Sequence, residues 1–237
     1  MSNLSKVKTA YNQYFERIKD NRNDLLSNPE VLFQNLAMFA SIVSAFSMFS
    51  EDRKILKILD VGCGKGDYLM HWFNWGFDIK NLYGIDILEE CIKNGQSQYP
   101  NFNLSCSDAS EMDFDDVFFD IVFENCIFLQ ITDNELAEKI ASQMLRVVKK
   151  GGFIIISDWR YGRNKKEHLA MNKKRLTRLF NVGEDTTFIK SIDGALAPPI
   201  GRFISKKFSS IYFLVQKMFP FLVGQKVTIL KKNKKGK

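Results

Sequence analysis

Cysteine is scarce in this chain, which has only four cysteines in 237 residues. Their spacings do not include the close pairs that zinc sites use, so we predict no metal site. Reduced thiols are therefore the default expectation. The sequence also lacks a start that is basic, then apolar, then rich in small residues, and we expect a cytoplasmic rather than a secreted protein.

Internal repeats and low-complexity linkers are also absent from the sequence, which argues against a second domain. With 45% hydrophobic and 26% charged residues, the chain has the composition of a soluble domain with a large core. We divide it into an N-terminal helical lid at 1–50, one α/β domain at 51–232, and a basic, disordered tail at 233–237.

Acidic residues become rare toward the C-terminus, so the two signs of charge are separated along the chain. Residues 1–158 carry a net charge of −8, whereas residues 159–237 carry +15. Five lysines lie in the last seven residues, but ten excess positive charges remain in the final third without them. A field of this kind attracts anionic partners and raises their local concentration.

A strand that runs into a glycine loop is the most informative pattern in the sequence. Residues 58–67 read Ile-Leu-Asp-Val-Gly-Cys-Gly-Lys-Gly-Asp, and a second strand ends on Asp86, twenty residues after the last glycine. Glycine lets the backbone approach a ligand in a tight turn, and the acid can accept both hydroxyls of a ribose. A dinucleotide fold would need glycine where Asp67 stands, and Asp60 would repel a pyrophosphate. The pattern therefore predicts a site for an adenosine compound with a cationic part and no phosphate.

On these residues the chain resembles the class I S-adenosylmethionine-dependent methyltransferases, whose signature is acid-x-Gly-x-Gly-x-Gly. The resemblance implies that S-adenosyl-L-methionine is the cofactor, that Asp60 faces its amino group and that Asp86 holds its ribose. It also implies that Asp108 binds the exocyclic amine of the adenine, with a turn cap as the alternative role. The implied cofactor-binding residues are Asp60, Gly62, Cys63, Gly64, Asp86, Ile87, Ser107, Asp108, Ala109, Glu124, Asn125 and Tyr14.

Strands and helices alternate along the chain, which predicts a mainly parallel sheet with helices on both faces. Seven strands in this order resemble the Rossmann-like α/β fold of the family, in which the last strand is antiparallel. Strands are expected near 55–61, 81–86, 102–106, 118–124, 152–157, 186–192 and 225–231. Helices are expected near 66–76, 88–98, 133–147, 164–181 and 202–218.

Two apolar stretches can be assigned either to the core or to a membrane. Residues 31–49 are long enough to cross a bilayer, but polar residues interrupt them, and we interpret them as a core or lid helix. Residues 211–223 mix bulky apolar residues with nearby lysines, which leaves core packing and an interfacial helix both open. Peripheral membrane contact through residues 202–223 follows from the second alternative.

The carboxyl end of the fifth strand is where open α/β sheets bind ligands, and the sequence supplies candidate acceptor-binding residues there. We predict that Arg160, Tyr161 and Arg163 contact the acceptor, because arginine can hold phosphate or carboxylate oxygens in a bidentate manner. Asp158 and His168 are the candidate catalytic bases. A base is needed only if the acceptor is a protonated hydroxyl or amine.

The acceptor has several candidates. The basic final third favours O-methylation of a small anionic acceptor, which would be a phosphorylated, nucleotide-linked or sugar compound. The segment 197–230 resembles methyltransferases of bacterial capsule and surface-polysaccharide biosynthesis. RNA or an anionic lipid is the alternative, although the chain lacks the Asn/Asp-Pro-Pro-aromatic signature of base-methylating enzymes, so we do not expect a nucleic-acid partner. A cofactor-binding scaffold without catalysis is a further alternative.

Overall fold

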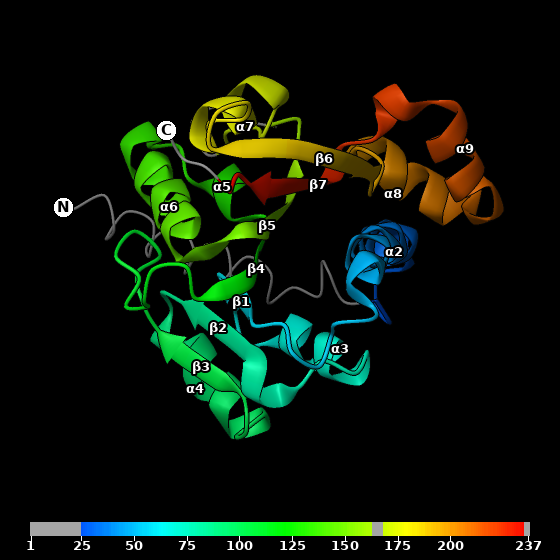
Figure 1. Ribbon diagram of the computed structural model, residues 1–237. Helices are drawn as coiled ribbons and strands as arrows, with labels where there is room; N and C mark the ends of the chain where they lie inside the picture. The colour runs from blue at the N-terminus through cyan, green and yellow to red at the C-terminus, as the bar shows by residue number, and fades with distance from the viewer. Residues whose placement is uncertain (1–24, 163–167, 235–237) are drawn as a thin grey trace.

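The computed structural model describes residues 25–162 and 168–234. One twisted sheet lies between two layers of helices (Figure 1). Its seven strands stand in the order β3-β2-β1-β4-β5-β7-β6. They are β1 (Ile58–Val61), β2 (Leu82–Asp86), β3 (Asn103–Cys106), β4 (Phe119–Asn125), β5 (Val148–Trp159), β6 (Thr186–Asp193) and β7 (Gln225–Lys232).

Strand direction in the sheet confirms the predicted Rossmann-like α/β fold. Strands β1 to β5 pair in parallel, and β7 runs antiparallel between β5 and β6. Because β6 is antiparallel to β7, it points in the same direction as β5. The carboxyl ends of six strands therefore meet at one edge of the sheet, which we call the carboxyl edge and where ligands of such folds bind.

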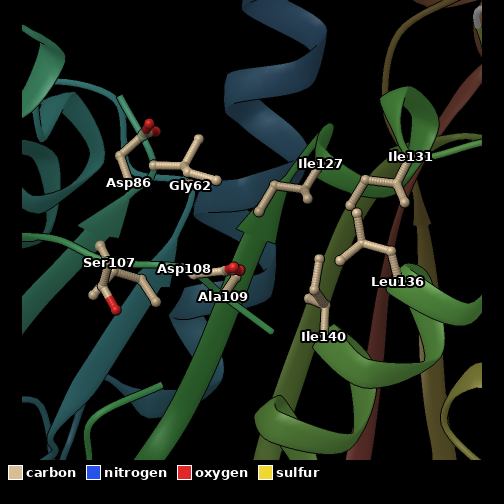
Figure 2. Close-up of a pocket in the computed structure, with 11 residues that line it drawn as sticks. Gly62, Asp86, Ser107, Asp108, Ala109, Ile127, Ile131, Leu136 and Ile140 are labelled. Atoms are coloured by element: carbon tan, nitrogen blue, oxygen red, sulfur yellow. The ribbon is translucent and has the colours of Figure 1, made fainter. Parts of the chain in front are cut away.

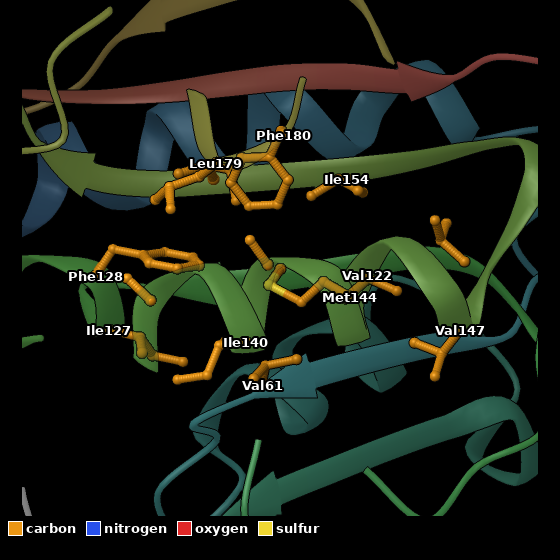
Figure 3. Packing of buried hydrophobic residues seen from close by; sticks show 14 of the residues in the cluster. Val61, Val122, Ile127, Phe128, Ile140, Met144, Val147, Ile154, Leu179 and Phe180 are labelled. Atoms are coloured by element: carbon orange, nitrogen blue, oxygen red, sulfur yellow. The ribbon is translucent and has the colours of Figure 1, made fainter. Parts of the chain in front are cut away.

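Each face of the sheet is covered by helices that the apolar pattern of the strands requires. On one face lie α2 (Leu32–Phe46), α3 (Asp67–Asn74) and α4 (Glu89–Gln98), which bury Phe46, Trp72 and Ile92. On the other face lie α5 (Ile127–Gln130), α6 (Asn134–Val147) and α7 (Lys173–Leu179). Figure 3 shows this second core, in which Met144 and Phe180 pack between the helices and strands β4 and β5.

The apolar stretch near the N-terminus forms a helix of the core. Residues Pro29–Phe49 are long and apolar enough to cross a bilayer by composition alone. In the structure, Ile42, Ala45 and Phe46 of α2 are buried against the sheet beside α3. The short helices η1 (Pro29–Val31) and η2 (Ser47–Phe49) flank α2. This part of the predicted lid therefore packs on a sheet face, and residues 1–24 lie outside the described residues.

The connection between β6 and β7 forms a helical insert at the carboxyl edge. It consists of α8 (Pro198–Lys207), η4 (Ser209–Ile211), α9 (Tyr212–Met218) and η5 (Pro220–Leu222). The prediction of one helix over 202–218 was wrong, because Phe208 leaves the helical conformation with φ of −142° and two serines follow it. The stem of the insert is closed by backbone bonds, among them Ala197 N to Leu222 O at 2.8 Å.

Several segment boundaries differ from the sequence prediction. The helix expected near 164–181 is observed as the shorter α7, and residues 168–172 before it are not helical. Strand β5 begins at Val148 instead of near residue 152, and the run Lys149-Lys150-Gly151-Gly152 belongs to its irregular start. At the C-terminus, the backbone N–H of Asn233 donates to Asp185 O at 2.8 Å, so the predicted tail begins with an ordered residue. Residues 235–237 lie outside the described residues.

Candidate functional site

The loop after β1 folds back over the end of β2. The backbone N–H groups of Gly62 and Cys63 both donate to Ile85 O, at 2.7 and 2.9 Å. Gly62 has a φ of +72°, and a Cβ there would stand 2.6 Å from Cδ1 of Ile127. At Gly64, with φ of +57°, a Cβ would meet nothing within 4 Å. The glycines at 62 and 64 are therefore required by backbone conformation, and at 62 also by space.

Asp86 joins this loop to the end of β2. Its Oδ2 accepts a hydrogen bond from Gly64 N and its Oδ1 accepts one from Leu88 N, both at 2.9 Å. Burial raises the pKa of the Asp86 carboxyl, while these backbone donors counteract the rise. Each carboxylate oxygen keeps a lone pair for a further donor, such as a ribose hydroxyl. The predicted position of this acid at the site is therefore the one observed.

A pocket that is partly open to solvent lies beside the loop (Figure 2). Its polar side is formed by the ends of β2 and β3, and its apolar side by α5 and α6. Six of the twelve predicted cofactor residues line it: Gly62, Asp86, Ile87, Ser107, Asp108 and Ala109. The apolar residues that the sequence reasoning missed are Ile85, Ile127, Ile131, Leu136 and Ile140. An apolar wall opposite two carboxyls suits a flat heterocycle attached to a sugar.

Asp108 caps a turn and also lies in the pocket, so its predicted contact with the adenine stays a prediction. Its Oδ1 accepts a hydrogen bond from Ser110 N at 2.8 Å, which closes the turn after β3. The residue also lines the pocket beside Ser107 and Ala109 (Figure 2). A turn cap and a ligand contact are compatible here, because the carboxylate has further lone pairs.

Asp60 is a buried acid without a hydrogen bond on one of its oxygens. The residue is the last but one of β1, two positions before Gly62, and among the described residues its Oδ2 has no hydrogen-bond partner. Desolvation raises the pKa of this carboxyl well above its ordinary value, and the charges of Asp86 and Asp67 raise it further. A buried carboxylate oxygen without a hydrogen-bond partner is costly, and a cationic ligand group would satisfy it.

Besides Asp60 and Gly64, three predicted cofactor residues that the structure describes lie outside the pocket lining. The Cys63 side chain packs against Gly84 of β2, where a Cβ would stand only 2.8 Å from the sulfur. Glu124 is fully buried at the end of β4, and its Oε2 accepts a hydrogen bond from Ile127 N at 2.9 Å. Asn125 accepts a hydrogen bond from the Ser157 hydroxyl at 2.9 Å and so links β4 to β5. Tyr14 lies outside the described residues.

A buried charge cluster lies behind the ends of β4 and β5. Asp158 accepts hydrogen bonds from Leu129 N at 2.9 Å and Trp159 N at 2.6 Å. Burial raises the pKa of Asp158 to about 7, although these backbone donors and Arg175 oppose the rise. Burial and the charge of Asp158 together raise the pKa of Glu124. Both carboxylate oxygens of Asp158 thus accept a hydrogen bond from a backbone N–H. The role of Asp158 as a base stays a prediction.

The cluster predicts an unusual dependence of stability on pH. Asp158 binds its proton more tightly in the folded chain than in the unfolded chain, with a pKa raised from 3.8 to about 7. Its contribution to the free energy of unfolding is therefore fully present below about pH 4 and is lost as the pH rises through 7. Between pH 4 and 7, the free energy of unfolding should fall by a few kcal/mol in the unmodified protein and by less in Asp158→Asn. Urea unfolding at several pH values measures both.

The exposed Asp113 offers a matched control for this measurement. The variant Asp113→Asn should keep the pH dependence of the unmodified protein. An unchanged slope in Asp158→Asn would show that Asp158 does not titrate between pH 4 and 7.

The predicted acceptor residues have structural partners in the insert. The Arg160 guanidinium donates to Val223 O at 2.6 Å, Pro220 O at 2.8 Å and Phe221 O at 3.0 Å. The Tyr161 hydroxyl donates to Phe221 O at 2.9 Å. Nε and Nη2 of Arg160 thus hold carbonyls at the C-terminal end of the insert, and the roles of Arg160 and Tyr161 in acceptor binding stay predictions. Arg163 lies outside the described residues.

His168 follows the gap in the described residues, near the carboxyl edge. Its Nδ1 is buried and has no hydrogen-bond partner among the residues that the structure describes. The next residue anchors this segment to α5, because Leu169 N donates to Leu129 O at 2.8 Å. The proposed role of His168 as a base stays a prediction.

The fold and the site together define the class of protein. A glycine loop after β1, an acid ending β2 and an acid after β3 surround one pocket at the carboxyl edge of a seven-stranded sheet. This is the arrangement of a class I S-adenosylmethionine-dependent methyltransferase. Residues 52–207 match the family model described as "Methyltransferase domain", and the chain belongs to this family.

Curated relatives and solved structures agree with this assignment. The chain is 24% identical over 185 residues to a ubiquinone/menaquinone biosynthesis C-methyltransferase of Campylobacter jejuni, covering 76% of this chain and 70% of the relative. It is 32% identical over 106 residues to a demethylmenaquinone methyltransferase of Staphylococcus aureus, covering 44% and 43%. The fold resembles that of a Burkholderia thailandensis 1,6-didemethyltoxoflavin-N1-methyltransferase crystallised with S-adenosylhomocysteine, with a TM-score of 0.65, 12% identity and 98% and 92% coverage.

S-adenosyl-L-methionine is therefore the cofactor of this enzyme. The residues present fit it on physical grounds. The orphaned Oδ2 of Asp60 can accept from an ammonium group, and Asp86 can accept from ribose hydroxyls. The apolar wall of Ile127 and Ile140 can cover an adenine ring.

Proposed function

We propose that this methyltransferase acts on an apolar, ring-bearing acceptor of the quinol type. The observation that carries the proposal is the character of the insert at the carboxyl edge. Its surface is rich in exposed phenylalanines, and the nearby Arg160 is bound to backbone carbonyls. An acceptor that approaches past this insert meets apolar surface in place of a free guanidinium.

The position of the insert supports its role on the acceptor side. Its stem stands directly against Trp159, the last residue of β5, since a Cβ at Gly224 would lie 3.0 Å from the Trp159 ring. The backbone N–H of Arg160 donates to Gly224 O at 2.8 Å. The insert therefore sits beside the ends of β4 and β5, where the predicted acceptor segment begins.

The named relatives support the same acceptor class. The Campylobacter jejuni protein is named for C-methylation in ubiquinone and menaquinone biosynthesis, and the Staphylococcus aureus protein for methylation of demethylmenaquinone. Both names describe acceptors with a redox-active ring. The wider of the two matches covers three quarters of this chain.

The bound cofactor supplies a methyl group on a positively charged sulfur, which becomes a neutral thioether when that bond breaks. The chain's own contribution is alignment and exclusion of water, which suffice for much of the rate in such a transfer. The apolar side chains of Ile127, Ile131 and Leu136 keep water from one wall of the pocket. A new bond to an acceptor carbon releases one proton, for which Asp158 and His168 stay the candidate recipients.

A second candidate is the small anionic acceptor that the sequence favoured, including a compound of capsule or surface-polysaccharide biosynthesis. The net charge of +15 over residues 159–237 favours it. Arg160 speaks against it, because its guanidinium already donates three hydrogen bonds to carbonyls.

Methyl-labelled S-adenosylmethionine distinguishes the two acceptors. The purified protein is incubated with reduced demethylmenaquinone in detergent, and separately with a low-mass acidic extract of bacterial cells and with total RNA. We expect label in the quinol fraction, released in a form that is soluble in organic solvent. Label in the acidic extract alone would replace our proposal by the anionic acceptor, and label in RNA alone would replace both.

A further inference from the structure

We infer that the outer face of the insert docks on the surface of an anionic lipid bilayer. This outer face consists of the exposed side chains between Phe203 and Phe221. The inference extends the proposed function from a soluble encounter to delivery of the acceptor from a membrane. It also stands without that function, because its argument uses only the composition and exposure of the insert.

Exposed bulky apolar side chains are concentrated on this insert. Among the described residues, nineteen large hydrophobic side chains are exposed, and eight of them fall within 203–221. Phe203 is 58% exposed and Phe221 is 65% exposed. The eight residues are Phe203, Phe208, Ile211, Phe213, Leu214, Met218, Phe219 and Phe221. The rings of Phe203 and Phe208, and those of Phe219 and Phe221, lie 5.9 Å apart in each pair. Exposed apolar side chains gathered in this way on a soluble fold mark an interaction site.

The insert does not need these side chains for its own packing. Its inner face is formed by Ile204 and Tyr212, which are buried together with Leu196 and Val223. The hydroxyl of Tyr212 accepts a hydrogen bond from Leu196 N at 3.1 Å, which fixes α9 to the stem. The helices α8 and α9 are thus apolar on the side that faces the protein and again on the side that faces solvent. Of the eight exposed side chains, Phe213 also lies against Phe33 and Tyr212, at ring-centroid distances of 6.2 and 5.6 Å.

Charge on the insert favours an anionic surface as the occupant. Residues 194–224, which form the insert and its stem, contain four lysines and arginines and no aspartate or glutamate. Lys207 and Lys217 are exposed at the ends of α8 and α9, next to the apolar side chains. Helices that lie in a membrane interface combine an apolar face with lysine and arginine in this way. Each such cation near an anionic leaflet contributes about 1 kcal/mol.

A second copy of the chain fits this surface less well than a bilayer does. Two insert faces brought together would oppose cation to cation, because acids are absent from this part of the sequence. The cores of protein interfaces are also depleted in lysine. The acidic first two thirds of the chain would be repelled by an anionic surface, so the field of the whole protein turns the insert toward it.

The docked orientation would bring the carboxyl edge close to the lipid. The insert leaves from the end of β6 and returns to the start of β7, both at this edge (Figure 1). The glycine loop and the acid of β2 lie at the same edge. An acceptor dissolved in the bilayer would therefore be presented on the side from which the pocket is reached.

Vesicle binding tests the inference with the full chain and without any quinol. The anionic probes are phosphatidylcholine vesicles that contain about 30% phosphatidylglycerol, which gives a surface charge on the order of that of a cell membrane. The neutral probes are vesicles of pure phosphatidylcholine. We expect flotation with the anionic vesicles at low salt, at least tenfold weaker binding to neutral vesicles, and weaker binding to both at high salt. Failure of the unmodified protein to float with anionic vesicles would overturn the inference.

A pair of variants separates docking from folding. The double variant Phe203→Gln, Phe221→Gln changes two exposed rings of the insert and should weaken anionic-vesicle binding at least tenfold. The double variant Ile55→Gln, Val117→Gln makes the same kind of change at exposed positions before β1 and β4, at the opposite edge, and should bind as the unmodified protein does. Both should retain affinity for S-adenosylmethionine, which reports intact folding.

Each remaining outcome decides the question. Equal loss in both double variants, or none in the first, would contradict docking through the insert. Self-association that the first double variant abolishes, without vesicle binding, would assign the surface to a second copy of this chain. Because no acceptor is present, these results are independent of whether quinol methylation succeeds.

Discussion

Replacing Asp86 by alanine should weaken the binding of S-adenosylmethionine by about 10- to 100-fold. Charge-assisted hydrogen bonds of the kind that Asp86 can offer to ribose hydroxyls contribute about 1–3 kcal/mol. The same carboxylate accepts from Gly64 N and Leu88 N, so its loss also loosens the glycine loop. Isothermal titration of the variant with S-adenosylmethionine and with S-adenosylhomocysteine gives the affinity directly.

Asp78 provides the matched control for this variant. Its carboxylate also accepts a backbone hydrogen bond two residues on, from Lys80 N at 3.0 Å, but it caps the short helix η3 (Ile79–Asn81) away from the pocket. Asp78→Ala should therefore lose a similar local bond and keep the affinity. Unchanged affinity in Asp86→Ala would remove Asp86 from the cofactor site.

Replacing Asp60 by asparagine should stabilise the cofactor-free protein and weaken cofactor binding at the same time. The buried Oδ2 has no hydrogen-bond partner among the described residues, and burial raises the pKa of this carboxyl. A neutral amide removes the cost of ionising that group, which we expect to raise the free energy of unfolding by about 1–3 kcal/mol above pH 7. The amide cannot pair with an ammonium group, so affinity for S-adenosylmethionine should fall at least tenfold.

Thermal unfolding without cofactor measures the change in stability, and thermal unfolding at increasing cofactor concentrations measures the change in affinity. Asp120 is the matched control, because its carboxylate is already paired with Lys149 Nζ at 2.8 Å and with Lys57 N at 2.9 Å. Asp120→Asn should destabilise the protein and leave the affinity unchanged. A fall in stability for Asp60→Asn would mean that the carboxylate is well compensated in the free protein.

The sequence was sufficient where function depends on the local backbone. The positions of Gly62 and Asp86 followed from the strand, the turn and the spacing, since these impose the same geometry wherever they occur. The seven strands followed from apolar runs that a two-sided sheet requires. Asp108 was expected at the site from the family resemblance, and it lines the pocket. Its bond to Ser110 N confirms the turn-cap alternative, while the contact with the adenine stays a prediction.

The sequence was insufficient where distant segments meet. The apolar wall around Ile127 follows β4 directly, and the run Ile127-Phe128-Leu129 after a strand could have indicated it. Arg160 gave no such sign, because its carbonyl partners Pro220, Phe221 and Val223 stand about sixty residues away. An arginine in a loop can bind an anion or the chain's own carbonyls, and the sequence alone does not show which carbonyls lie near it.

The closed stem of the insert allows the insert to change in sequence without a change in the sheet. Leu196 pairs with Val223, and Gly194 N donates to Gln225 O at 3.0 Å, so the two ends of the insert are fastened to each other next to the sheet. Strands β6 and β7 would remain neighbours if everything between these points were exchanged. We propose that the insert contributes to the choice of acceptor. Replacement of its roughly thirty residues, in evolution or by design, would then change the acceptor while the strands that hold the methyl donor keep their register.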